Sequence, residues 1–301
     1  MIKIDNLTKV FSKRTGPAID SVSFEVANGE IVGFVGLNGA GKTTTIRVAA
    51  GISLPTAGGV SVDGYDVVTQ KVEASKRTGW VPELPNFEPN SSAVDLMEYY
   101  AGFYDIPGSE AESKSMSLLK SVGLEGVERK KLRTYSQGMK KRFSLAACLL
   151  SSPSNYLFDE ILNGLDPEGI RDFRRLMTDL KSRGSAVLLS SHILVEIESL
   201  ADRIVFIHRG RVIKTISRGD LAKVGEAIVR IVFRKVDDAA LEYLRGVGGV
   251  RVEDNTVFLS TASDAAEINA ELIRRGYQIS EFGAQKEGLE DYFLDLIGEA
   301  K

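Results

Sequence analysis

The stretch GLNGAGKTT, from Gly36 to Thr44, decides the fold, because it places glycines, a lysine and a hydroxyl at the spacing that wraps backbone around the phosphates of a nucleotide. The glycines allow backbone angles that turn successive N–H groups onto anionic oxygens. Lys42 is expected to meet the β- and γ-phosphates, and the hydroxyl of Thr43 to meet Mg²⁺. The residues expected to bind nucleotide here are Gly36, Leu37, Asn38, Gly39, Ala40, Gly41, Lys42, Thr43 and Thr44.

The residues on both sides of this loop agree with that interpretation. The apolar run at 31–35 predicts a buried strand, and residues 44–50 predict the start of a helix whose positive dipole end faces the bound anion. Apolar strands then alternate with helical patterns and glycine turns to about residue 222. This order is typical of an α/β fold in which helices flank a parallel sheet.

A different order begins after residue 224 and predicts a second domain. It is the split β-α-β-β-α-β order of a ferredoxin-like unit, followed by a last helix. The predicted elements are a strand at 227–236, a helix at 237–246, strands at 249–253 and 256–260, a helix at 263–275, a strand at 277–283 and a helix at 287–298. We therefore expect one domain over residues 1–222 and a small α+β domain over residues 223–301.

Composition and charge exclude several classes of protein. The 301 residues include 38 basic and 41 acidic side chains, so no overall positive field attracts nucleic acid, and no nucleic-acid partner is expected. No apolar stretch approaches the roughly 18 residues that a membrane-spanning helix needs. The first residues also lack the apolar core of a signal peptide. The sequence predicts a cytoplasmic location.

Two adjacent carboxylates end an apolar strand pattern at 155–160. Ligands of open α/β sheets bind beyond the carboxyl ends of the strands, so Asp159 and Glu160 are within reach of a nucleotide held by the glycine loop. Asp159 is predicted to bind Mg²⁺. Glu160 is predicted to orient or deprotonate the attacking water, a catalytic role worth about 10²- to 10⁴-fold in rate. A solvated acidic pair is the simpler interpretation in isolation, but the upstream loop favours catalysis.

Two further polar positions lie at the ends of apolar patterns. His192 directly follows the strand pattern at 186–191 and is predicted to act in catalysis by hydrogen-bonding the γ-phosphate or the water. Ser136 precedes an amphipathic helix, which its hydroxyl can cap. The same helix start, with the N–H of Gly138, is also an anion site. The residues by themselves leave both interpretations of Ser136 open.

Together these pieces resemble the nucleotide-binding subunit of an ATP-binding cassette (ABC) transporter over residues 1–222. GLNGAGKTT is similar to its Walker A motif, NYLFDE to Walker B with the catalytic glutamate, NGLDP to the D-loop and LLSSH to the switch histidine, while YSQGM stands in place of the LSGGQ signature. Phe11 matches the aromatic residue that stacks on adenine, with an ordinary core phenylalanine as the alternative. The resemblance implies a P-loop NTPase core with a mixed sheet and a helical subdomain at about 84–150.

Two positions depart from the family pattern. Glu83 stands at the Q-loop position, where glutamine is commoner. Its negative charge could bind Mg²⁺ more strongly than glutamine does, or repel phosphate when the metal is absent. The predicted metal ligands are therefore Thr43, Glu83 and Asp159. Asn163 replaces the usual D-loop serine, which leaves communication between two nucleotide sites open.

The resemblance also implies partners. Two such chains, identical or different, are expected to close head to tail around ATP, so that Ser136 and Gly138 of one complete the phosphate site of the other. ATP hydrolysis would drive separate transmembrane permease subunits docked on about residues 84–130, which would hold the chain on the inner face of the membrane. The segment LEDYFLDLIG, from Leu289, resembles the end of cassettes of drug and multi-substrate exporters and favours export over import. The alternative is a soluble cassette ATPase acting on a partner outside the membrane.

Overall fold

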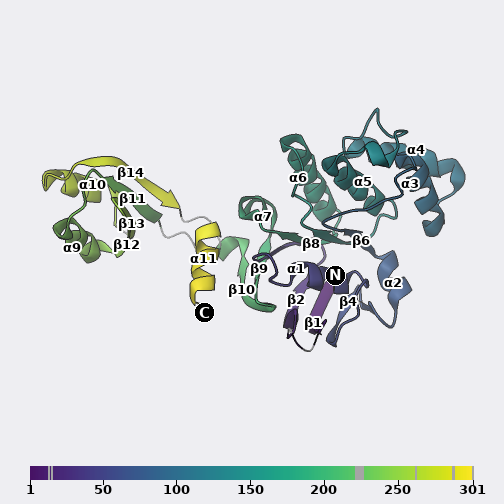
Figure 1. Ribbon diagram of the computed structural model, residues 1–301, viewed down its shortest axis with the longest axis horizontal. Coiled ribbons are helices and arrows are strands. Elements are labelled where there is room, and N and C mark those ends of the chain that lie inside the picture. The colour runs from purple at the N-terminus through teal and green to yellow at the C-terminus, as the bar shows by residue number, and fades with distance from the viewer. Residues whose placement is uncertain (13, 15, 221–226, 262, 287–288, 300–301) are drawn as a thin grey trace. The chain divides into compact units, whose positions relative to one another are not determined.

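The computed structural model describes residues 1–301 except 13, 15, 221–226, 262, 287–288 and 300–301. The chain divides into two compact units, Met1–Ser217 and Arg218–Lys301 (Figure 1). Each unit has a hydrophobic core of its own. The predicted boundary near residues 223–226 lies outside the described residues.

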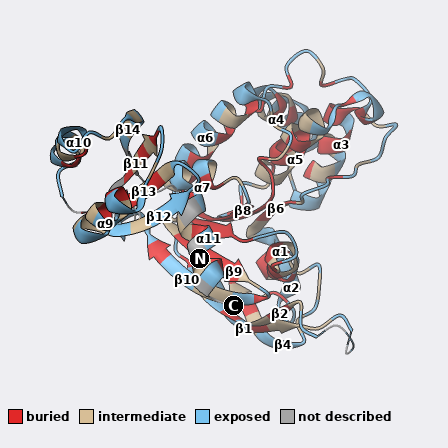
Figure 2. Ribbon diagram, turned by 60° about the vertical axis from the view of Figure 1, so that its left-hand side comes forward, coloured by how far each residue is buried: buried red, intermediate tan, exposed pale blue. Residues whose placement is uncertain are grey.

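A six-stranded sheet forms the centre of the first unit. Its strands are β3 (Ile31–Val35), β6 (Thr78–Val81), β7 (Asn155–Asp159), β8 (Ala186–Ser191), β9 (Arg203–His208) and β10 (Arg211–Ser217). They are arranged in the order β10-β9-β3-β8-β7-β6, and only the β10–β9 pair is antiparallel among these described strands. The sheet is therefore mixed. β3, β7 and β8 are buried along their whole length, and β8 is accordingly red in Figure 2. Burial on both faces explains the mainly apolar sequences of these strands.

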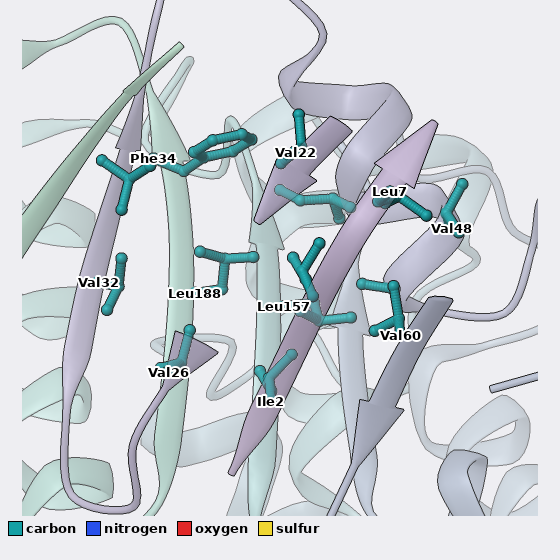
Figure 3. Packing of buried hydrophobic residues seen from close by; sticks show 14 of the residues in the cluster. Ile2, Leu7, Val22, Val26, Val32, Phe34, Val48, Val60, Leu157 and Leu188 are labelled. Atoms are coloured by element: carbon teal, nitrogen blue, oxygen red, sulfur yellow. The ribbon is translucent and has the colours of Figure 1, made fainter. Parts of the chain in front are cut away.

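A second, antiparallel sheet packs against the helix that follows the phosphate loop. Its strands are β1 (Ile2–Lys9), β2 (Ile19–Val26), β4 (Ala57–Val62) and β5 (Tyr65–Asp66), in the order β2-β1-β4-β5. Helix α1 (Lys42–Ala49) contributes Val48 to one continuous core with Ile2 and Val60 from this sheet and Leu157 and Leu188 from the six-stranded sheet (Figure 3). The apolar pattern predicted a parallel sheet and the family resemblance predicted a mixed one, which is confirmed. Neither distinguished the separate antiparallel sheet.

Several helices complete the first unit. They are α2 (Lys71–Lys76), α3 (Ala93–Ala101), α4 (Gly108–Ser121), α5 (Gln137–Leu149), α6 (Pro167–Ser182) and α7 (Leu194–Leu200). Of these, α3, α4 and α5 follow β6 and precede β7, in the stretch where a helical subdomain was expected. Polar caps fix where two of the helices begin: Ser92 accepts from the Asp95 N–H at 3.2 Å, and Asp166 accepts from the Gly169 N–H at 3.1 Å.

The second unit is an antiparallel sheet with helices. Its elements are β11 (Ala227–Phe233), α9 (Asp238–Val247), β12 (Gly249–Glu253), β13 (Thr256–Ser260), α10 (Ala265–Arg274), β14 (Ile279–Lys286) and α11 (Leu289–Glu299). The strands are ordered β12-β13-β11-β14, and every neighbouring pair is antiparallel. The elements follow the predicted sequence, with ends that differ by a few residues. The assignment to the ferredoxin-like class stays a prediction.

Candidate functional site

The phosphate loop runs between β3 and α1, and its glycines are required by both backbone angle and space. Gly39 and Gly41 have φ angles of 78° and 113°, in the left-handed region that side chains rarely adopt. A Cβ on Gly36 would lie 2.5 Å from the carbonyl oxygen of Ile207, and one on Gly41 would lie 2.6 Å from Cγ2 of Ile19. A larger residue at either position would therefore force a neighbouring strand to move.

Helix α1 begins at Lys42, two residues before the predicted start at residue 44. Lys42 and Thr43 therefore lie in its first turn, where backbone N–H groups have no partner within the helix and the dipole favours an anion. No acidic side chain occupies this first turn. The helix start is thus electrostatically suited to phosphate.

A pocket of about 340 Å³ opens beside the loop and brings together residues from distant parts of the sequence. Its lining consists of Ala18, Asn38, Gly39, Gly41, Lys42, Thr43, Thr44, Glu83, Glu160, Asn163 and His192. Most of these are residues for which the sequence predicted a role. The other predicted site residues lie outside this lining: Phe11, Gly36, Leu37, Ala40, Ser136, Gly138 and Asp159.

Lys42 is a buried cation at the floor of this pocket. Its Nζ donates to the carbonyl oxygens of Gly36 at 2.6 Å and Leu37 at 3.2 Å, so these two loop residues position the lysine although they do not line the pocket. Nζ also lies 3.2 Å from Oε1 of Glu160, and both side chains are about 5% exposed. A buried ion pair of this kind persists only when further hydrogen bonds satisfy its atoms.

The carboxylate of Glu160 has such partners. Its Oε2 lies 2.9 Å from Nδ1 of His192 and accepts from Nδ2 of Asn163 at 3.2 Å. His192 is half-exposed, with its ring at the mouth of the pocket. The backbone of Glu160 is unusual, because its φ of 48° is left-handed for a residue with a side chain. The carboxylate is therefore held toward the phosphate loop by side chains on both sides.

Asp159 does not line the pocket and is 1% exposed, but it contacts Thr43, which does line it. It accepts hydrogen bonds from Oγ1 of Thr43 at 3.1 Å and from Oγ of Ser190 at 2.9 Å. Burial raises the pKa of Asp159, and the two hydroxyl hydrogen bonds act in the opposite direction. A desolvated carboxylate beside a threonine hydroxyl gives two oxygen atoms that suit Mg²⁺, which prefers few protein ligands together with phosphate and water.

Glu83 follows β6, lines the same pocket and is itself exposed. Burial lowers the pKa of Lys141, and the charge of Glu83 opposes that lowering. Burial raises the pKa of Asp159, and the charge of Glu83 adds to that increase. In the described part of the chain, no group of three or more His, Cys, Asp or Glu side chains is arranged around a common metal position. A direct bond from Glu83 to Mg²⁺ stays a prediction.

Ser136 is the N-cap of α5, as the simpler interpretation of its position predicted. Its Oγ accepts from the N–H of Met139 at 3.2 Å. Ser136 is exposed and Gly138 half-buried, and neither lines the pocket of their own chain. A Cβ on Gly138 would lie 3.0 Å from the carbonyl oxygen of Gly164, so the start of α5 closely approaches the loop before α6.

Phe11 is not a core residue, because its side chain is 66% exposed. The ammonium of Lys9 lies 5.0 Å from the centre of its ring. An exposed aromatic face is free to stack on a base, but Phe11 does not line the pocket in this structure. Stacking on adenine stays a prediction.

Arg142 connects α5 to the ends of two other helices. Its Nη1 donates to the carbonyl oxygen of Val122, just after α4, at 3.2 Å, and its Nη2 donates to Oδ1 of Asp166 at 2.6 Å. The hydrogen bond from Arg142, together with that from the Gly169 N–H, holds the pKa of Asp166 below its ordinary value. The Arg142 side chain is 11% exposed and that of Asp166 61%, so this connection extends from the interior to the surface of the unit.

The sequence reasoning missed two buried polar residues of the site. Ser190 donates to Asp159 and accepts from the N–H of Glu160 at 3.0 Å, and Lys141 donates from Nζ to the carbonyl oxygen of Glu160 at 2.8 Å. Ser190 ends β8 beside the end of β7, so its polarity in an apolar run was a usable signal. For Lys141 the signal was weaker, since lysines on amphipathic helices are normally exposed.

The comparison with known proteins decides the family. The model of the ABC transporter family matches residues 19–163. The chain is also 32% identical to the bacitracin transport ATP-binding protein BcrA of Bacillus licheniformis, in an alignment of 303 positions that covers 99% of this chain and 97% of that protein. The chain belongs to the ATP-binding proteins of ABC transporters. It is accordingly an ATPase.

Other relatives of this ABC ATPase agree. It is 35% identical to the lantibiotic transport ATP-binding protein SrtF of Streptococcus pyogenes over 213 positions, which cover 71% of this chain and 89% of that protein. The solved ATP-binding subunit of an ABC transporter matches it with a TM-score of 0.69 and 29% identity, covering 74% of this chain and 92% of that one. These matches support the P-loop NTPase core. Within the described residues, no helix of this ABC ATPase is both long and apolar enough to span a bilayer.

Proposed function

We propose that this ABC ATPase hydrolyses ATP with Mg²⁺ in the pocket beside the phosphate loop and thereby drives export through separate transmembrane subunits. The observation that carries the proposal is the arrangement of Glu160. Its carboxylate is buried, points to the pocket, and is held by Lys42 on one oxygen and by His192 and Asn163 on the other. A carboxylate in this position is suited to accept a proton from a water molecule that attacks the γ-phosphate.

The other residues of the pocket bind and orient. The loop residues Gly36 to Thr44 would direct N–H groups at the phosphates, and Lys42 would turn its ammonium from Glu160 to the β- and γ-oxygens. Asp159 and Thr43, with Glu83 as a further candidate, would hold Mg²⁺, which when bound neutralises charge on the phosphates. His192 would orient the Glu160 carboxylate and the attacking water.

A second chain is part of the proposal. Ser136 and Gly138 are accessible, stand at the positive end of a 13-residue helix, and are outside the pocket of their own chain. They are therefore suited to cover the phosphates bound by a partner cassette. Head-to-tail closure of two identical or related cassettes would bury both nucleotides, and a ligand that favours the closed state can do work on whatever is attached.

The transmembrane subunits would attach at an aromatic groove of about 480 Å³ lined by parts of β6, α3 and α5. Phe103 lines it and is 67% exposed, and its ring centre lies 5.1 Å from that of Tyr99, which is 64% exposed. Exposed apolar and aromatic clusters of this kind mark protein interaction sites. The proposed occupant is a transmembrane subunit, which would place the ATPase at the inner face of the membrane.

Two observations support export. One is the C-terminal segment from Leu289, and the other is that relatives at 32% and 35% identity are the bacitracin and lantibiotic transport proteins. The cargo itself is left open.

The competing function is a cassette ATPase that acts on a partner outside the membrane. Purification of the chain from membranes together with an integral membrane protein supports the first function, and its absence from membranes supports the second.

The variant Glu160→Gln tests the site directly. The amide keeps the shape but cannot accept the proton, so we expect ATP binding within about threefold of the parent, a fall in kcat of at least about 100-fold, and a dimer stable to size-exclusion chromatography in ATP and Mg²⁺. The double variant Lys42→Ala with Glu160→Gln is the control and is expected to stay monomeric. Turnover of Glu160→Gln at the parent rate would remove Glu160 from the mechanism.

A further inference from the structure

We infer that Lys141 is a positioning residue that fixes the backbone of Glu160 and so ties the catalytic carboxylate of a chain to that chain's own helix α5. The inference rests on the proposed function, because it concerns how the proposed catalytic base is held. Lys141 does not line the nucleotide pocket. Its hydrogen bonds go to the main-chain oxygens of Glu160 and Ile161, and the charge of the Glu160 carboxylate also acts on its ammonium.

The first observation is the contact itself. Lys141 is 4% exposed, and its Nζ donates to the carbonyl oxygen of Glu160 at 2.8 Å, with the carbonyl oxygen of Ile161 at 3.5 Å. A buried ammonium is unfavourable unless hydrogen bonds replace its water, and a space-filling role would be met better by an apolar side chain. The ammonium is therefore retained for the bonds that it makes to this stretch of backbone.

The second observation is the backbone conformation that these bonds hold. Glu160 has a φ of 48°, which is disfavoured for a residue with a Cβ and persists only where the surroundings impose it. Its N–H donates to Oγ of Ser190 at 3.0 Å, while its C=O accepts from Lys141. The residue is thus held from both sides by polar side chains on separate elements, β8 and α5. Loss of either bond would let the carboxylate turn from its position.

The third observation is the place of Lys141 on its helix. α5 begins at Gln137 with Ser136 as its cap, so Lys141 lies about one helical turn beyond the residues proposed to face the partner's nucleotide. A helix moves as a rigid unit over such a distance. Any shift of Ser136 and Gly138 on meeting a phosphate is therefore passed to the carbonyl oxygen of Glu160. This links the nucleotide bound by the partner to the hydrolytic centre of the chain itself.

The test uses three variants of the full chain. Lys141→Met keeps the stem and removes the ammonium, Lys141→Gln keeps a donor for the carbonyl oxygen without the charge, and Lys120→Met removes an exposed lysine of α4 as the control. We expect Lys141→Met to lower kcat about 30-fold, which corresponds to about 2 kcal/mol. Lys141→Gln should recover at least about a third of the parent kcat, and Lys120→Met should be unchanged. The affinity for ATP should stay within about twofold in all three, because the phosphate loop is intact.

A kcat of Lys141→Met equal to that of the parent would overturn the inference, as would a common loss of kcat, ATP affinity and thermal stability in both Lys141 variants. A second measurement tests the inference even if Lys141→Met folds poorly. In the Glu160→Gln background, Lys141→Gln should still form the ATP-dependent dimer, and failure to do so would also overturn the inference. If Glu160→Gln alone forms no dimer, the proposed function fails instead, so the two failures are distinguishable.

Discussion

The two units of the chain differ in what they bury. In the described part of the chain the buried charged residues all lie within Met1–Ser217, and they are Lys42, Glu128, Lys141, Asp159 and Glu160. In the described part of Arg218–Lys301, Thr261 is the one buried polar residue. The core of this unit is formed by apolar residues such as Phe233, Leu244 and Leu272. Buried charge is unfavourable for folding unless it is paired. Apart from Glu128, which lies between α4 and α5, the first unit accepts that penalty in the region where the reaction is proposed to occur.

Because their interiors differ in this way, the two units should respond differently to mutation. In the first unit, removing a buried polar atom leaves a partner unsatisfied and changes the reaction. In the second unit, removing apolar atoms leaves a cavity and changes only stability. A substitution in the second unit that lowered kcat without lowering stability would contradict this division of roles between the units.

The largest expected effect belongs to Lys42→Ala. It removes the cation that the phosphates are proposed to meet and leaves Glu160 without its ion-pair partner. We expect kcat/KM to fall by at least about 1000-fold and ATP binding to be lost in equilibrium binding measurements. Lys76→Ala, an exposed lysine on α2, is the control. Binding of Lys42→Ala within threefold of the parent would contradict the site.

Phe233→Ala tests the other unit. Phe233 is 2% exposed in the second core, so its truncation should lower the free energy of unfolding of that unit by about 3–5 kcal/mol. ATP affinity should stay within about twofold. Urea unfolding followed together with ATP binding measures both quantities. The half-exposed Leu294 offers the control Leu294→Ala, which should change unfolding far less. A large loss of ATP affinity in Phe233→Ala would mean that the units do not divide stability and chemistry as inferred.

A smaller effect is expected from Ser190→Ala. The change removes the acceptor of the Glu160 N–H and a donor to Asp159, so kcat should fall about tenfold, or about 1.4 kcal/mol. Ser191→Ala is a matched control on the same strand, since the Ser191 Oγ accepts from the N–H of Ile193. Steady-state kinetics at saturating ATP measures kcat for both variants. Equal values for the two variants would argue against a specific role for Ser190.

The smallest effect is the pH dependence that arises from Asp166. Its pKa is lowered in the folded chain, mainly by the hydrogen bond from Arg142, below the ordinary value of 3.8. The ionised form therefore stabilises the fold above that value, and the contribution is lost as the pH falls through the folded pKa. The difference in urea midpoint between the parent and Asp166→Asn should be greatest near neutral pH and shrink as the pH falls below the ordinary value of 3.8 and the carboxyl protonates. A difference that grows on acidification would contradict the lowered pKa.

Much of the fold could be predicted because its signals are local. Glycines at 36, 39 and 41 specify a loop conformation, and the apolar runs at 31–35 and 155–159 specify buried strands. The elements of the second unit follow from alternation and turns. The pocket then brings the glycine loop together with Glu160 and His192, as expected from polar residues at the ends of neighbouring strands.

The remaining features depend on contacts between distant parts of the chain. Lys141 bonds to a carbonyl oxygen, and every residue has one, so no side-chain pattern identifies the acceptor. The left-handed backbone of Glu160 has no sequence signal either, because glutamate rarely adopts it. The separate antiparallel sheet was missed since β1 and β4 pair across more than fifty residues. Alternating apolar residues predict a strand but not its partner.

The guanidinium of Arg142 has a further consequence for which substitutions the chain can accept. A Cβ on Gly123 would lie 2.2 Å from its Nη1, and one on Gly169 would lie 3.0 Å from its Nη2. A second constraint acts at each position, because Gly123 has a left-handed φ of 75° and a Cβ on Gly169 would also lie 2.8 Å from Oδ1 of Asp166. In closely packed interiors such positions change together or not at all. A deep mutational scan should find that alanine at residue 123 or 169 is tolerated better when residue 142 is also made smaller.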